Sequence, residues 1–173
     1  GNYRFNSHVG FVEENEIDQI KEVVDFISFD FVSDSDVIKR VYHLDKSVEE
    51  YIKLYKLLKS KIETYPHITI GLDGGKIHWE YSAIDILHAI GSDRLVLNVL
   101  IPTEGTDFEK VNPPDLDEVR KVFQYARKVF NKELRDKPQT KDQIFGKTYG
   151  EYRQALELEF DEFVKLRQYA EEV

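Results

Sequence analysis

Two runs of alternating apolar and polar residues flank the tripeptide Asp73-Gly74-Gly75, and this pattern constrains the fold more than any other in the chain. Asp-Gly and Gly-Gly pairs readily adopt the positive φ angles of the tight turns that connect antiparallel strands. Residues 67–72 and 76–81 are therefore predicted to form a β-hairpin. Hairpins of this kind belong to sheets that pack one face on a core and leave the other face in water.

The predicted hairpin has one apolar and one polar face, because side chains alternate along a strand. The apolar face carries Ile68, Ile70, Leu72, Ile77, Trp79 and Tyr81, and the polar face carries His67, Thr69, Lys76, His78 and Glu80. We expect Trp79 to be buried in the core. His67, His78 and Glu80 are candidate catalytic residues, since two imidazoles and a carboxylate can hold zinc or form an acid-base pair. Their spacing matches no known motif, so an ordinary wet surface is the alternative interpretation.

Helical spacing and capping signals predict the elements around the hairpin. Ser47 and Glu50 form a capping box, in which each side chain accepts a hydrogen bond from the other residue's backbone amide. This box predicts a helix over residues 48–64, which Pro66 ends. The other predicted elements are a strand over 3–12, a helix over 16–27, a strand over 37–44, a helix over 82–90, a strand over 95–101 and a helix over 116–130.

A polar connection marked by prolines, residues 103–114, separates two parts of the chain. Residues 1–102 carry the predicted strands. Residues 115–173 carry long amphipathic stretches and are predicted to form a helical hairpin, packed on the same core or seeking a partner helix. The predicted fold class is therefore α+β: a small antiparallel or mixed sheet with helices packed on one face, followed by a C-terminal helical hairpin, in a single domain overall.

Acidic residues dominate the charge of the chain and are concentrated near its start. The net charge is -9 and the sequence pI is about 5.1. Residues 13–50 contain 12 acidic and 4 basic residues, so this segment alone carries a charge of -8. Binding to nucleic acid or to an anionic membrane needs clustered Lys and Arg, so neither partner is expected. The predicted helix over 16–27 aligns acidic side chains on one face, where they could dock a basic protein.

The chain contains 0 cysteines, which excludes disulfides, thiolate metal sites and cysteine nucleophiles. This composition fits a reducing, cytoplasmic compartment. Phosphate-binding and dinucleotide-binding glycine motifs and the Gly-x-Ser-x-Gly signature are also missing from the sequence. We therefore expect no cofactor and no metal ion. His8 and His43 lie alone on predicted strands, and only tertiary folding could bring them into a site.

The function that the sequence favours is a non-enzymatic, acidic protein-binding module, with an inhibitor or immunity-type protein that masks a basic partner as its concrete form. The expected contact residues are Glu14, Asp18, Glu22, Asp25, Tyr152 and Tyr169. The C-terminal helices could also pair two copies of the chain in a homo-oligomer. The alternative is a small hydrolase or metal-binding enzyme, or a ligand sensor, that uses the polar face of residues 67–81.

Overall fold

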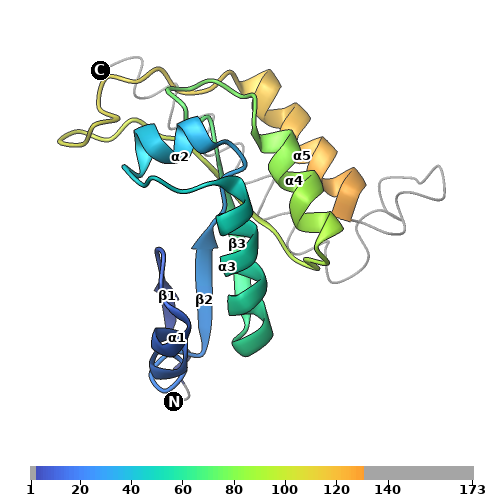
Figure 1. The fold of residues 1–173 in the computed structure, drawn as a ribbon. Helices are drawn as coiled ribbons and strands as arrows, with labels where there is room; N and C mark the ends of the chain where they lie inside the picture. Colours follow the sequence, from blue (N-terminus) through green and yellow to red (C-terminus); the bar gives the residue numbers. More distant parts are fainter. Residues whose placement is uncertain (1–2, 131–173) are drawn as a thin grey trace. The chain divides into compact units, whose positions relative to one another are not determined.

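A computed structural model describes residues 3–130 of the chain. The chain divides into two compact units, Gly1–Phe130 and Asn131–Val173, so the described residues all belong to the first unit. This unit alternates strands and helices in the order β1 (Asn6–His8), α1 (Glu14–Ile20), β2 (Phe26–Asp30), α2 (Ser35–Val41), α3 (Val48–Lys61), β3 (Thr64–Ile70), α4 (Glu80–Ala89), β4 (Val96–Val99) and α5 (Leu116–Phe130). Figure 1 shows this order along the ribbon.

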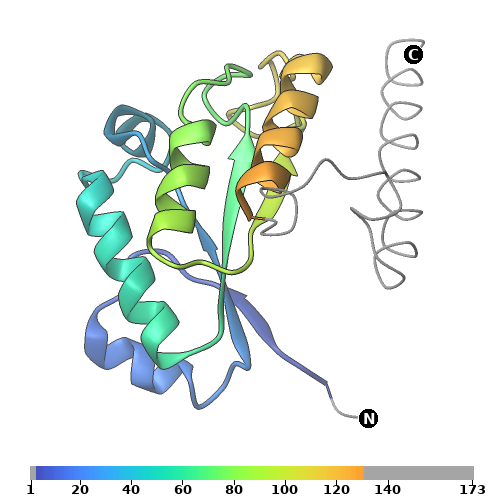
Figure 2. The same cartoon turned by 90° about the vertical axis from the view of Figure 1, so that its right-hand side faces the viewer.

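The four described strands form one sheet in the order β1-β2-β3-β4, and every neighbouring pair is parallel. Strands that follow one another in the same direction need crossover connections, and these are almost always right-handed. A sheet whose sequence order equals its spatial order therefore receives its helices on one face. Figure 2 shows α1, α3 and α4 on the same side of the strands. A β/α barrel is built by the same repeated step, with helices outside and strands inside.

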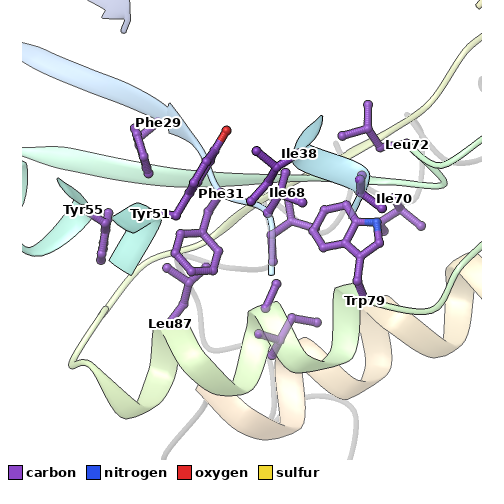
Figure 3. Close-up of a cluster of buried hydrophobic side chains, with 14 of the residues drawn as sticks. Phe29, Phe31, Ile38, Tyr51, Tyr55, Ile68, Ile70, Leu72, Trp79 and Leu87 are labelled. Atoms are coloured by element: carbon purple, nitrogen blue, oxygen red, sulfur yellow. The ribbon is translucent and has the colours of Figure 1, made fainter. Parts of the chain in front are cut away.

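The hydrophobic core lies between the sheet and these helices. Ile27 and Phe29 on β2 and Ile68 and Ile70 on β3 point toward the helices, and each is at most 2% exposed. Strand side chains alternate between faces, so these residues define the core face of the sheet. The aromatic rings of Phe29 and Tyr55 stack here with their centroids 6.2 Å apart. Figure 3 shows this cluster, which also contains Phe31, Tyr51, Trp79 and Leu87.

Several local predictions are confirmed. Ser47 and Glu50 make both hydrogen bonds of the capping box, and the helix that follows is α3. Helix α5 spans the predicted residues and buries Val119, Val122 and Ala126. Trp79 is only 2% exposed, as expected.

The predicted β-hairpin is wrong, and so is the antiparallel or mixed sheet. β3 pairs with β2 and β4 in parallel, and residues 76–81 form no strand. Residues 71–79 are a loop that leads into α4, with a single antiparallel bridge between Asp73 and Lys76. Gly74 and Gly75 do have positive φ angles of 62° and 83°. They serve a loop turn instead of a hairpin, and a Cβ on Gly75 would lie 2.2 Å from the carbonyl oxygen of Asn112.

Three other predicted elements also differ. The helix over 16–27 ends at Ile20, a turn follows, and Phe26 and Ile27 begin β2. The strand over 37–44 is helix α2, because the side chain of Asp34 accepts hydrogen bonds from the amides of Asp36 and Val37 and caps it. The strand over 3–12 is reduced to β1. The predicted connection at residues 103–114 lies inside the first unit, and the rest of the C-terminal helical hairpin lies outside the described residues.

Candidate metal centre

The face of the sheet opposite the core carries polar side chains. The strand registers align Asn6 with Phe26, His8 with Ser28, Ser28 with Tyr65, Asp30 with His67 and Thr69 with Asn98, and all of these residues share the second face. The helices described above supply the core on the other face. We call this second face the open face. Parallel sheets usually bury both faces in apolar contacts, so polar residues here need another explanation.

Three side chains that can bind metal ions meet on the open face. His8, Asp30 and His67 each offer one ligand atom, and the three atoms lie within 4.8 Å of one another. The His8 Nδ1 atom is 3.9 Å from an Asp30 carboxylate oxygen. The rings of His8 and His67 meet edge to face with their centroids 5.2 Å apart. Parallel pairing produces this cluster, since His67 is the register partner of Asp30 and His8 lies on the next strand.

The environment of the His67 ring favours the neutral imidazole. Its Nδ1 atom is buried and has no hydrogen-bond partner among the described residues. A buried polar atom without a partner normally costs free energy, so such an atom is uncommon in a folded protein. Burial lowers the pKa of His67 below its ordinary value, although the nearby charge of Asp30 opposes this effect. The imidazole is therefore neutral near pH 7, which is the form that binds metal ions.

Two imidazoles and one carboxylate form a common donor set for zinc and other divalent transition metals. Ligand atoms about 2.1 Å from a tetrahedral zinc ion are about 3.4 Å apart. The His8 and Asp30 ligand atoms, 3.9 Å apart, are about 0.5 Å farther apart than this value. His8 is exposed, and Asp30 and His67 are half-buried, so the site is open to solvent.

The cluster lies where β1 and β2 end. His8 is the last residue of β1 and Asp30 is the last residue of β2. The carboxyl ends of parallel strands are the usual place for binding sites in barrels and open α/β sheets, because the loops that follow can vary without disturbing the core. The position of the cluster thus agrees with its chemistry.

A cavity of about 140 Å³ adjoins the cluster, and His8 and Asp30 are part of its wall. Tyr42 and Tyr51 also contribute to the wall. Burial and the charge of Asp30 raise the pKa of both phenols, that of Tyr51 to about 12. Both hydroxyls therefore remain protonated and can donate hydrogen bonds.

The structure separates the three candidate residues of the predicted hairpin. His67 joins the metal cluster. Glu80 is fully buried at the start of α4, where its carboxylate accepts hydrogen bonds from the amides of Gly71 and His78, each at 2.8 Å. Glu80 thus fixes the loop between β3 and α4, and it does not reach the other two side chains.

His78 takes part in a different charged cluster. Its Nε2 atom lies 2.9 Å from Asp73, and its Nδ1 atom lies 3.7 Å from Asp34. Arg40 donates a hydrogen bond to Asp73 at 2.6 Å, and this contact lowers the pKa of that carboxyl below its ordinary value. Arg40 belongs to α2, Asp34 precedes that helix, and Asp73 and His78 belong to the β3–α4 loop. We interpret the cluster as a support that joins α2 to the β3–α4 loop.

The acidic residues expected to dock a partner are not on one helix face. Glu14 and Asp18 lie on α1, and both contact Lys61 of α3. Glu22 and Asp25 follow the end of the helix. The Asp25 carboxylate accepts a hydrogen bond from the Phe5 amide at 2.6 Å. Tyr152 and Tyr169 lie outside the described residues, so their predicted role stays a prediction.

Sequence reasoning missed His8 and Asp30 as members of a site. The useful signal is that each polar residue follows apolar or β-forming residues at the end of a strand, but this signal can be used only when the strands are known to be parallel. The expectation that the chain binds no metal depended on the missing cysteines and on the absence of a closed set of histidines. Folding brings the set together from three strands.

No known protein family matches the chain, and no curated protein matches its sequence. Within residues 3–130, no helix combines the length and the apolar character needed to span a bilayer.

Proposed function

We propose that the protein binds a divalent transition-metal ion, zinc being the best fit, through His8, Asp30 and His67. The observation that carries this proposal is the convergence of these three side chains within 4.8 Å, beside the carboxyl ends of β1 and β2. His67 supports it, because its Nδ1 atom is buried without a hydrogen-bond partner among the described residues, and a metal ion bound at that atom would supply one.

The number of protein ligands favours a reactive site over a structural one. Structural zinc sites usually have four protein ligands, whereas catalytic sites have three and keep a position for water or substrate. A water molecule bound to zinc loses a proton near pH 7 and becomes a nucleophile. A metal-dependent hydrolase, acting in a reducing compartment such as the cytoplasm, is therefore the class of enzyme that this centre suits.

Zinc titration by calorimetry tests the proposal. Because the chain has 0 cysteines, thiolates contribute no background binding. The wild-type protein should bind one equivalent of zinc. His67→Ala and Asp30→Asn should each weaken zinc binding by more than about a hundredfold, because loss of a residue that only hydrogen-bonds a metal ligand already weakens metal affinity by about 10- to 100-fold. His43→Asn is the matched control, because His43 is an exposed histidine away from the strands.

Failure of the wild-type protein to bind zinc, cobalt(II) or nickel(II) at neutral pH would refute the proposal. Equal loss of binding in His43→Asn would also refute it, because the ion would then be held elsewhere.

A second candidate function is the docking of a basic protein partner, as an inhibitor or immunity-type protein would do. One observation favours it: Val23 is 70% exposed in the turn after α1, next to Glu22. A partner that covered this side chain would remove its apolar area from water, which favours association. Glu22→Lys should slow association with a captured basic partner at low salt, and an unchanged rate would exclude this surface.

A further inference from the structure

The cavity beside the metal cluster extends the site beyond the three ligands. Val9, Phe11, Phe29 and Leu44 contribute apolar wall, and Tyr42 and Tyr51 contribute aromatic rings with hydroxyl groups. The volume of about 140 Å³ is close to that of an engineered protein cavity, about 150 Å³, that binds benzene, so it suits a single ring. The cavity is formed by the ends of β1 and β2, the loop after β1, and the residues between α2 and α3.

The metal cluster and the cavity share two residues. His8 and Asp30 both line the cavity and both belong to the cluster. An ion held by them therefore has a coordination position next to the cavity. A ligand in the cavity could bind that ion directly with one end while its body contacts the apolar wall.

The polar groups around the cavity indicate which charge a ligand should carry. Tyr42 and Tyr51 line the cavity, and the phenol hydroxyl of a tyrosine is a hydrogen-bond donor. Figure 3 shows the hydroxyl oxygen of Tyr51 pointing away from Phe31 and Leu87. Phenol donors and a bound cation both favour an oxygen-bearing anion.

We propose that the ligand of this site is a small organic oxyanion with an apolar body, such as an aromatic carboxylate, whose oxygens coordinate the metal ion while its body fills the cavity. This inference rests on the proposed function, because it requires the ion at His8, Asp30 and His67. Tyr42 is assigned as a hydrogen-bond donor to the anionic group, and Phe11 and Leu44 as contacts of the apolar body.

The test compares benzohydroxamate and acetohydroxamate, which carry the same metal-binding group on a large and a small body. Binding of each to the zinc-loaded and zinc-free full-length protein is measured by calorimetry. Zinc-loaded protein should bind benzohydroxamate at least about tenfold more tightly than acetohydroxamate, because only the former buries a ring. Zinc-free protein should bind neither at millimolar concentration.

Tyr42→Phe should weaken binding of benzohydroxamate by about tenfold without changing zinc affinity, since it removes one donor. Tyr125→Phe is the matched control, because the hydroxyl of Tyr125 donates to Asp85 on α4 and does not line the cavity.

Equal affinity for the two hydroxamates in a protein that binds one equivalent of zinc would overturn the cavity assignment and leave the metal proposal intact. Tight binding of benzohydroxamate by zinc-free protein would also overturn it. Absence of zinc binding would overturn both proposals together.

Discussion

The two faces of the sheet use neighbouring residues of the same strands for different purposes. On β2 and β3, Ile27, Phe29, Ile68 and Ile70 point toward the helices, and each is at most 2% exposed. The residues between them, including Ser28, Asp30, His67 and Thr69, point to the open face. The core face has apolar side chains that the fold requires. The open face has mainly polar side chains, and three of them, His8, Asp30 and His67, can bind a metal ion.

This difference separates stability from function along a single strand. Burial of apolar area provides most of the free energy of folding, so substitutions on the core face should reduce stability. Substitutions on the open face should change binding much more than stability. The following predictions test that separation, starting from the largest effect.

Trp79→Ala should lower the free energy of unfolding by about 3–5 kcal/mol, because it removes a large side chain from the core and leaves a cavity. The side chain is 2% exposed and lies in the cluster of Figure 3. Urea unfolding followed by circular dichroism measures the change. A loss below about 1 kcal/mol would show that the helix-covered face does not dominate stability.

Glu80→Gln should lower the free energy of unfolding by about 2 kcal/mol, because the amide cannot accept from both backbone N–H groups as well as a carboxylate does. These donors belong to Gly71 and His78, which border the β3–α4 loop. The same unfolding assay applies, with Glu104→Gln as an exposed control. Equal stability of the two variants would contradict a structural role for the buried carboxylate.

His67→Asn should change the stability of the metal-free protein by less than about 1 kcal/mol at pH 7.5, since the His67 Nδ1 atom makes no hydrogen bond. Zinc at a hundredfold excess over its dissociation constant should stabilise the wild-type protein by about 2.7 kcal/mol and should not stabilise the variant. A large loss in the metal-free variant would show that the open face also supports the fold.

The smallest expected effect concerns pH. Burial lowers the pKa of His67 in the folded protein, so the unfolded chain binds more protons just below the ordinary histidine pKa of about 6.5. Stability should therefore fall as pH decreases through this range. Metal-free His67→Asn should lose less stability than the wild-type protein between pH 7 and pH 5 by urea titration. Identical slopes would mean that His67 titrates normally.

Local signals predicted the parts of the fold that depend on nearby residues. The capping box at Ser47 and Glu50, the amphipathic α5 and the burial of Trp79 are all encoded within a few residues. A turn at Asp73-Gly74-Gly75 was also predicted, but the strand predicted after it is a loop, because a loop that enters a helix can show the same alternation as a strand. Ile77 and Trp79 fit both patterns over so short a range.

Parallel pairing could not be predicted from these signals. The paired strands are distant in the chain, and the sequences of the connecting helices do not show whether the strands on either side run in the same direction. β2 was assigned to the end of a helix because Val23, Val24 and Ile27 have helical spacing. With β2 misplaced, Asp30 had no neighbours on a sheet. The candidate metal centre depends on the registers of β1, β2 and β3 together, so only His67 was singled out from the sequence.

The most direct test of the metal centre is a crystal structure of the full-length protein grown with zinc, with anomalous differences collected on both sides of the zinc absorption edge. The account predicts one anomalous peak about 2.0–2.2 Å from His8, Asp30 and His67, on the open face beside the cavity. A zinc ion at full occupancy that is bound by other residues, while these three side chains coordinate no ion, would contradict it.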